Sequence, residues 1–199
     1  MNRWNLYSQN GEDGVLAEIF ASVGTRNRWC CELGAWDGKL FSNTRHLIEN
    51  GWAAVLFECE RDRFRELLAN TSAGMTVYAE NALVESLDES LAEYPIPQDF
   101  DLLSIDVDGK DYRLWHDLGD YEPRVVVIEV NSSKPVSSTD QFDDERGTAI
   151  RPMVELGQHK GYTLVAHTGN AIFVRNDLAT DEQREADWRT LFDTSWVTE

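Results

Sequence analysis

The sequence feature that most constrains the fold is an unbroken apolar run near the middle of the chain. Residues 124–130 read Arg-Val-Val-Val-Ile-Glu-Val, so β-branched side chains occupy successive positions and do not alternate with polar ones. Residues 55–57 have the same character. Such runs are typical of strands that are covered on both faces, which occur mainly in parallel sheets flanked by helices. The chain therefore predicts an α/β fold.

Strand-like and helix-like segments alternate along the rest of the chain. We predict strands at 28–33, 53–58, 75–79, 100–105 and 124–130, and helices at 43–49, 61–69, 83–91, 111–118 and 150–160. Two further strands, 162–166 and 171–175, are joined by the turn Thr168-Gly169-Asn170, which predicts a hairpin. The predicted fold is a Rossmann-like, doubly wound sheet of seven strands, mostly parallel, with one antiparallel strand on its edge side.

The 199 residues suit one domain. We expect an N-terminal helical or lid segment at 1–27, a core at 28–176 and a C-terminal helical segment at 177–199. The aromatic residues Trp188 and Trp196 in the last segment either pack on the core or serve an interface in a homo-oligomer. Residues 131–147 form a long polar loop, and loops of that length are often functional.

Composition limits the kinds of partner and the cellular compartment that we expect for this protein. The chain has 18 Lys and Arg against 36 Asp and Glu, and its net charge of −18 disfavours a nucleic-acid partner. No apolar run reaches the length of a membrane span, and the N-terminus lacks the apolar region of a signal peptide. Cys30, Cys31 and Cys59 lie in apolar runs and indicate reduced core thiols. We therefore expect a cytoplasmic protein.

The loop after the first predicted strand is the expected ligand site, because open parallel sheets bind ligands at the carboxyl ends of their strands. It reads Glu32-Leu33-Gly34-Ala35-Trp36-Asp37-Gly38 and lacks the GxGxxG pattern of dinucleotide-binding loops. Its carboxylates suit a cationic ligand with an amino group and a sulfonium, which points to S-adenosylmethionine. Glu58 ends the second strand and is expected to accept hydrogen bonds from ribose hydroxyls. Asn81 follows the third strand and is expected to face an adenine edge.

Three segments carry a family resemblance. Residues 32–38 together with Glu58 resemble the first two motifs of class I S-adenosylmethionine-dependent methyltransferases. The stretch Ser8-Gln9-Asn10-Gly11-Glu12-Asp13-Gly14 resembles the opening of FkbM-like methyltransferases, and residues 104–112 are similar to the wider group. The resemblance extends over about 8–175 and implies that Gln9 lies near the cofactor mouth. The expected cofactor-binding residues are thus Gln9, Glu32, Gly34, Ala35, Asp37, Glu58, Asn81 and Asp106.

Oxygen-bearing side chains end two neighbouring strands. Asp106 and Asp108 follow the fourth strand, and Glu129 and Asn131 end the fifth. Such hard oxygen ligands suit Mg²⁺, Mn²⁺ or Ca²⁺, and the arrangement resembles that of metal-dependent O-methyltransferases acting on catechols and macrolide sugars. The alternative is a structural role, with a turn at Asp108 and backbone partners for the other groups.

Deprotonation of an acceptor hydroxyl requires a base. The predicted catalytic residues are Asp106, Asp108, His167 and Lys110. His167 ends the sixth strand, so its ring is expected to reach the same cleft. Lys110 is a second candidate base or a counter-charge to the carboxylates.

The predicted function is an O-methyltransferase that modifies a hydroxyl of a sugar, polysaccharide or secondary metabolite, so its partner is a small-molecule or glycan acceptor. Two alternatives remain open. The pattern Asp106-Val107-Asp108-Gly109 also resembles the nucleophile motif of Mg²⁺-dependent haloacid-dehalogenase-like phosphatases, with Asp143-Asp144 as a later acidic pair. The second alternative is a non-catalytic binding or scaffold protein with the methyltransferase fold.

Overall fold

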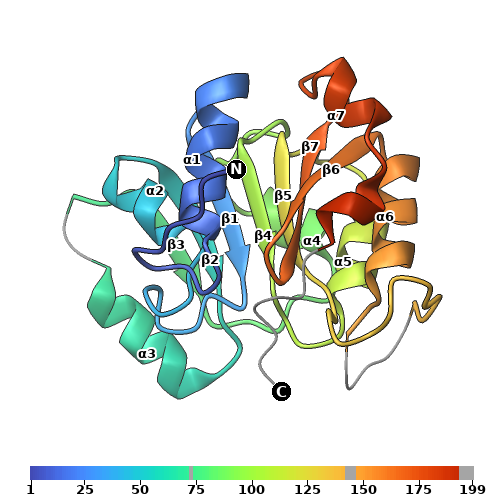
Figure 1. The fold of residues 1–199 in the computed structure, drawn as a ribbon. Helices are drawn as coiled ribbons and strands as arrows, with labels where there is room; N and C mark the ends of the chain where they lie inside the picture. Colours follow the sequence, from blue (N-terminus) through green and yellow to red (C-terminus); the bar gives the residue numbers. More distant parts are fainter. Residues whose placement is uncertain (72–73, 142–146, 193–199) are drawn as a thin grey trace.

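A seven-stranded sheet forms the centre of the molecule (Figure 1). The computed structural model describes residues 1–71, 74–141 and 147–192. The strands are β1 (Trp29–Leu33), β2 (Ala53–Phe57), β3 (Val77–Glu80), β4 (Leu102–Ile105), β5 (Val125–Glu129), β6 (Tyr162–His167) and β7 (Asn170–Arg175). Their order in the sheet is β3-β2-β1-β4-β5-β7-β6. β7 pairs antiparallel with β5 and β6, and the other neighbouring pairs are parallel. The predicted fold class is confirmed.

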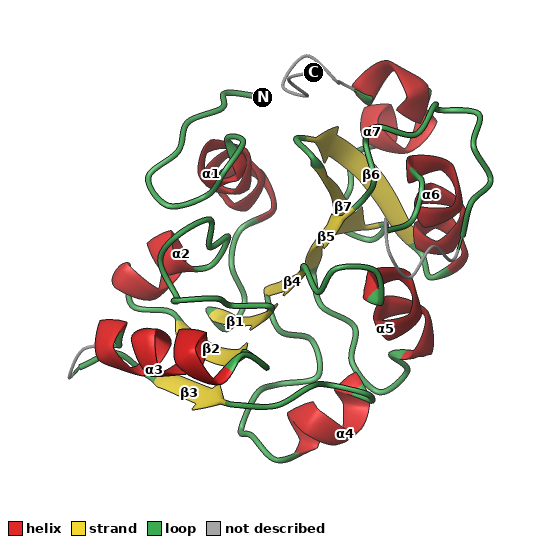
Figure 2. Cartoon of the chain, turned by 90° about the horizontal axis from the view of Figure 1, so that it is seen from below, coloured by secondary structure: helices red, strands yellow, loops and turns green. Residues whose placement is uncertain are grey.

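Helices cover both faces of the sheet, as the view in Figure 2 shows. One face carries α1 (Glu12–Val23), α2 (Arg45–Glu49) and α3 (Arg61–Asn70), and the other carries α4 (Leu87–Ala92), α5 (Asp111–Asp117) and α6 (Ile150–His159). Val125 and Val127 of β5 belong to the hydrophobic core on the first face, and Val126 and Ile128 belong to the core on the second. The unbroken apolar run in this strand thus serves two cores at once.

The C-terminal segment packs beside β6. Helix α7 (Asp181–Glu185) is closed by a capping box at Thr180, and the 3-10 helix η1 (Trp188–Leu191) follows it. Trp188, Leu191 and Phe192 are half-buried against the core, which agrees with the packing role considered for the aromatic residues. Trp196 lies outside the described residues, as does the Asp143-Asp144 pair of the long loop. In the described part of the chain, no helix has both the length and the apolar character that a membrane span requires.

Local predictions differ from the structure in three places. The helix predicted from residue 43 begins at Arg45, because residues 42–44 turn inward to bond Glu32. The helix predicted from residue 83 begins at Leu87, where the Ser86 hydroxyl accepts a hydrogen bond from the Glu89 N–H. The prediction that Cys59 is a core thiol is wrong, because β2 ends at Phe57 and Cys59 is exposed, whereas Cys30 and Cys31 are buried.

The order of strands places a crevice at the centre of the sheet. β1 pairs with β2 on one side and with β4 on the other, so consecutive strands leave β1 in opposite directions. Loops that follow the carboxyl ends of β1 and β4 therefore diverge and leave space between them. This is where the sequence places the ligand loop.

Candidate functional site

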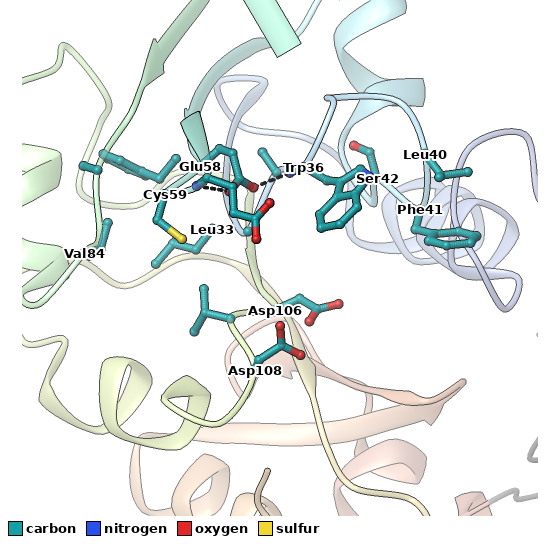
Figure 3. Close-up of a pocket in the computed structure, with 16 residues that line it drawn as sticks. Leu33, Trp36, Leu40, Phe41, Ser42, Glu58, Cys59, Val84, Asp106 and Asp108 are labelled. Atoms are coloured by element: carbon teal, nitrogen blue, oxygen red, sulfur yellow. Dashed lines mark hydrogen bonds between the residues drawn. The ribbon is translucent and has the colours of Figure 1, made fainter. Parts of the chain in front are cut away.

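A pocket of about 240 Å³ lies at this crevice. Its walls are the loop after β1 (residues 34–36 and 40–42), the end of β2 and the residues beyond it (57–60), two residues after β3 (82 and 84) and the loop after β4 (106–108). Figure 3 shows Cys59 and Val84 at one end, Leu40 and Phe41 at the other, and Asp106 and Asp108 along one side. The end at Cys59 and Val84 thus lacks charged labelled side chains, and Asp106 and Asp108 lie beside the middle.

Gly34 brings the loop after β1 into direct contact with the end of β4. Its φ of 73° lies in the left-handed region, and a Cβ atom at this position would overlap the carbonyl oxygen of Asp106. Glycine is therefore required twice, for the conformation and for the close approach. Gly34 and Ala35 both donate their N–H groups to the Phe57 carbonyl at 3.0 Å, which fixes the loop to β2.

Glu58 holds the pocket wall in shape. Its carboxylate is buried and accepts hydrogen bonds from the Trp36 N–H at 2.8 Å and the Glu60 N–H at 2.6 Å (Figure 3). Each carboxylate oxygen has room for a further donor, because an ionised carboxylate offers about four acceptor sites. Glu58 lines the pocket, so the structure places it where the sequence predicts a ribose-binding residue.

Three other predicted cofactor residues make hydrogen bonds that stabilise the segments around the pocket. The buried Glu32 accepts hydrogen bonds from the Ser42 hydroxyl, the Thr44 hydroxyl and the Asn43 N–H at 2.6 to 2.7 Å. Burial raises the pKa of Glu32, and these donors oppose the shift. The Asp37 carboxylate accepts two backbone N–H groups of its own turn, and the Asn81 amide donates to the carbonyls of residues 58 and 59. None of the three is among the described residues that line the pocket.

The N-terminal motif organises a strap formed by residues 2–10. One oxygen of Asp13 accepts the N–H groups of Leu6, Tyr7 and Ser8 at 2.7 to 3.0 Å. The fully buried Glu12 accepts hydrogen bonds from the Thr168 hydroxyl at 2.6 Å and the Asn170 amide at 3.2 Å.

The predicted cofactor residue Gln9 is exposed, and its carbonyl accepts a bond from the Asn5 amide. Sequence reasoning singled out this motif and missed the part played by its two carboxylates. The sequence signal that could have indicated this part was the pair of acidic residues, Glu12 and Asp13, in the first turn of α1.

Three carboxylates meet beside the pocket. One oxygen each from Asp106, Asp108 and Glu129 lie within 4.8 Å of one another. Asp108 has a φ of 53°, and the buried Asp111 holds this turn by accepting the Val107 and Gly109 N–H groups at 2.9 and 3.0 Å. The structure thus brings together three of the four predicted metal-binding residues.

Asn131, the fourth predicted ligand, follows β5 by two residues. Its side-chain oxygen accepts hydrogen bonds from the Ser133 N–H at 3.0 Å and the Ser133 hydroxyl at 2.5 Å. A structural partner therefore occupies that oxygen in the described fold. Three carboxylates at this spacing still offer the hard oxygen donors that Mg²⁺ or Mn²⁺ prefers.

The carboxyl groups of the cluster repel one another when they are ionised. Burial raises the pKa of Asp106 to about 7, and the neighbouring Asp111 and Asp108 add to the shift. Burial, followed by repulsion from Asp106, raises the pKa of Glu129 to about 8. Both shifts have the sign expected when like charges share a partly desolvated site. A divalent cation between these groups would remove the repulsion, so the residues present fit a metal ion.

The two other predicted bases are engaged by partners outside this cluster. His167 is buried, its Nε2 lies 2.8 Å from the Ser132 hydroxyl, and its ring packs on Phe192. The Lys110 ammonium pairs with Glu85 at 3.1 Å on the surface. Neither is among the described residues that line the pocket, whereas Asp106 and Asp108 are.

Several solved structures that share this architecture are methyltransferases. The chain superimposes with a TM-score of 0.56 on magnesium protoporphyrin IX methyltransferase from Synechocystis PCC 6803 with bound S-adenosylhomocysteine, at 11% identity over 82% of this chain and 81% of that one. An S-adenosylmethionine-dependent methyltransferase from Clostridium acetobutylicum ATCC 824 gives 0.53, at 10% identity over 84% and 92%. The N-terminal domain of EvdMO1 with bound S-adenosylhomocysteine gives 0.51, at 18% identity over 85% and 80%.

These similarities define the class of fold. The chain has the Rossmann-like fold of class I S-adenosylmethionine-dependent methyltransferases, with seven strands and an antiparallel β7. Comparison with protein-family models found no match, and comparison with curated protein sequences found none either. Identities between 10 and 18% establish the fold alone, so the activity has to be argued from the site.

Proposed function

We propose that this protein is an S-adenosylmethionine-dependent O-methyltransferase whose methyl transfer is assisted by a divalent cation. The observation that carries the proposal is the position of the carboxylate cluster. Asp106 and Asp108 line the pocket that Glu58 and the loop after β1 enclose, and Glu129 lies within reach of both. A cofactor site and a site for activating a hydroxyl thus share one crevice.

The pocket residues suit the parts of the cofactor. Glu58 has acceptor capacity for ribose hydroxyls, and the end at Cys59 and Val84 suits a flat purine ring. When bound, the cofactor supplies a methyl group on a positively charged sulfur atom, which is already a good leaving group. The protein therefore has to orient the acceptor and manage its proton.

The carboxylate cluster is the proposed centre for the acceptor. Asp106, Asp108 and Glu129 would hold Mg²⁺ or Mn²⁺, which would lower the pKa of an alcohol bound to it. A carboxylate of the cluster would accept the proton, and Asp106 and Asp108 are the two that line the pocket. His167 and Lys110 are less suited as bases, because Ser132 and Glu85 already engage them.

The proposed acceptor is a hydroxyl of a sugar, polysaccharide or secondary metabolite. Trp36 and Phe41 line the pocket with 39% and 54% of their surface exposed, and aromatic faces of this kind pack well against the apolar faces of ring compounds. Both residues adopt positive φ values, 49° and 61°, which are unfavourable for bulky side chains. Such strain is concentrated at functional sites, which supports a role in binding the acceptor.

Calorimetric titration with S-adenosylmethionine and S-adenosylhomocysteine tests the cofactor. Glu58→Gln should weaken binding of both ligands about tenfold or more, since it removes a charged acceptor. Glu18→Gln, at an exposed position of α1, is the matched control and should bind as the parent does. Failure of the folded protein to bind either ligand would refute the proposal.

Transfer of a labelled methyl group to a panel of sugars and phenols tests the reaction. Activity should disappear with a chelator and return with Mg²⁺ or Mn²⁺. Cofactor binding without transfer to any acceptor would favour the non-catalytic binding protein instead.

A further inference from the structure

We propose that the end of the pocket at Leu40 and Phe41 binds an apolar part of the acceptor, so that the acceptor is a small metabolite with an apolar body and not a polysaccharide. The inference rests on the proposed methyl transfer and deepens it, because it chooses among the acceptor classes that the proposed function leaves open. Leu40 and Phe41 are then specificity-determining residues.

Large apolar side chains are exposed at this end of the pocket. Leu40 and Phe41 line it with 52% and 54% of their surface exposed, and Trp36 is 39% exposed. Figure 3 shows Leu40 and Phe41 at the end opposite Cys59 and Val84. The purine of the cofactor is assigned to that opposite end, so the acceptor is the molecule that covers Leu40 and Phe41. Exposed apolar surface of this kind is typical of ligand-binding grooves.

The Ser42 hydroxyl, a polar group at this end, is already fully bonded. It donates to the Glu32 carboxylate at 2.7 Å and accepts the N–H groups of Arg45 and Thr44 at 3.0 and 3.3 Å. A hydroxyl has one proton and two lone pairs, so no capacity remains for a ligand. A sugar ring placed here would lose hydrogen bonds to water without replacement, whereas an apolar group has none to lose.

The loop holds its apolar side chains in place from both sides. The Asp37 carboxylate accepts the Leu40 N–H at 2.7 Å, and the Asp37 carbonyl accepts a hydrogen bond from the Asn70 amide at 2.8 Å. On the other side, Ser42 anchors the chain to Glu32. Because an anchored loop loses little conformational freedom when a ligand binds, the apolar surface is preorganised for binding.

The backbone of Phe41 supports a role in binding. Its φ of 61° lies in the left-handed region, which a bulky side chain rarely adopts and which glycine or asparagine adopts at lower cost. More than half of the side chain is exposed, so packing in the core does not explain a phenylalanine here. Unfavourable conformations of this kind are concentrated at ligand-binding sites. The residue therefore serves the pocket at the expense of stability.

Displacement of an apolar dye tests the site without turnover. The full chain is loaded with N-phenyl-1-naphthylamine, a neutral dye that fluoresces more strongly in apolar surroundings. Methyl glucoside and hexyl glucoside, which differ only in the length of the alkyl chain, then compete with it. Each methylene group removed from water strengthens binding up to about fourfold, so hexyl glucoside should displace the dye at a concentration about tenfold or more lower.

The outcomes separate this inference from the proposed function. Equal displacement by the two glucosides, or no binding of the dye, would overturn the inference and leave the cofactor assignment intact. Displacement as expected by a protein that does not bind S-adenosylmethionine would refute the proposed function instead.

Variants locate the apolar site. Phe41→Asn removes the ring and tolerates the left-handed conformation, and Leu40→Gln keeps the size of the side chain. Each should weaken competition by hexyl glucoside about fivefold and leave S-adenosylhomocysteine binding within about twofold. Phe41→Asn should not lower the urea midpoint, because asparagine relieves the strain. Leu68→Gln, at a 49% exposed leucine of α3, is the control and should compete as the parent does.

Two results with these variants would contradict the inference. Equal effects of Leu68→Gln and Phe41→Asn would mean that the dye binds elsewhere on the surface. A parent dimer that Phe41→Asn separates into monomers, measured by sedimentation, would show that a second copy of the chain covers Leu40 and Phe41.

Discussion

The backbone of Gly34 lies directly against the carbonyl oxygen of Asp106, with no space between them for a Cβ atom. This contact joins the loop after β1 to the loop after β4. It therefore fixes the relative position of the cofactor wall and of the first carboxylate in the cluster.

Gly34→Ala should destabilise the protein by about 3–5 kcal/mol, since a left-handed conformation is unfavourable for alanine and the methyl group would overlap backbone. Gly51 offers a control. Its φ of 84° is also positive, but no atom lies within 4 Å of the added Cβ, so Gly51→Ala should lose only about 1–2 kcal/mol. Urea unfolding measures both. Equal losses of unfolding free energy in the two variants would mean that the contact with Asp106 does not contribute to the effect of Gly34→Ala.

The carboxylate cluster predicts an unusual dependence of stability on pH. Folding raises the pKa of Asp106 to about 7 and of Glu129 to about 8, above their values of about 4 in an unfolded chain. Because the folded state holds these protons more tightly, its stability should fall as pH rises from about 4 to about 8. In EDTA the urea midpoint should be lower at about pH 8.5 than at about pH 5.5, and Mg²⁺ should restore it mainly at the higher pH.

Glu129→Gln separates the cluster from the general repulsion of an acidic protein. The variant should show a smaller loss of stability between the two pH values and a smaller response to Mg²⁺. A parent and variant with the same pH dependence would mean that the cluster does not control it.

Cys59 provides a reporter of pocket occupancy. It is exposed and lines the pocket, whereas Cys30 and Cys31 are buried. Alkylation requires alkaline pH, because burial and the charge of Glu58 raise the pKa of the Cys59 thiol. S-adenosylhomocysteine at about ten times its Kd should slow alkylation about tenfold. Mass spectrometry follows the modification, and the rate without S-adenosylhomocysteine is the baseline. Cys59→Ser should remove the modification. Unchanged alkylation at saturating ligand would place the ligand elsewhere.

A buried ion pair closes the opposite end of the sheet. Asp101 and Arg124 lie 2.6 Å apart and are 0% and 7% exposed in their side chains. Asp101 also accepts the backbone N–H groups of residues 26–28. Asp101→Ala would leave three backbone donors without an acceptor and the buried Arg124 guanidinium without its counter-charge, and should cost about 3–5 kcal/mol of stability.

Asp99 is the control for this pair. It bonds Arg26 with the cation 64% exposed, so Asp99→Ala should cost about 1 kcal/mol or less. Thermal and urea unfolding of the two variants give the comparison. A loss below about 1 kcal/mol in Asp101→Ala would show that water replaces the missing partner.

The sheet was readable from the sequence because burial on both faces leaves a pattern in single residues. The run at 125–128 appears as consecutive apolar positions, since its side chains enter two cores alternately. Element ends were less readable. The start of α2 at Arg45 depends on Glu32, which lies in another element and recruits residues 42–44.

The candidate site was readable in position and less so in detail. The places of Glu58, Asp106, Asp108 and Glu129 follow from the rule that parallel strands end at one edge. The surroundings of Glu32 and His167 depend on partners distant in the chain, such as Ser132, and no local pattern encodes them. Cys59 was misassigned because the apolar run hid the point where β2 ends, one residue before Glu58.

The bonds of Glu12 have a consequence for the order in which the chain acquires its structure. Its carboxylate meets Thr168 and Asn170, which lie 156 and 158 residues further along the chain. During synthesis from the N-terminus, the first helix emerges long before the hairpin that completes its hydrogen bonds. The start of α1 therefore stays unsatisfied until β6 and β7 have been made, and closing such distant contacts is slow. The N-terminal strap is therefore synthesised before the hairpin and reaches its final position only after the hairpin has formed.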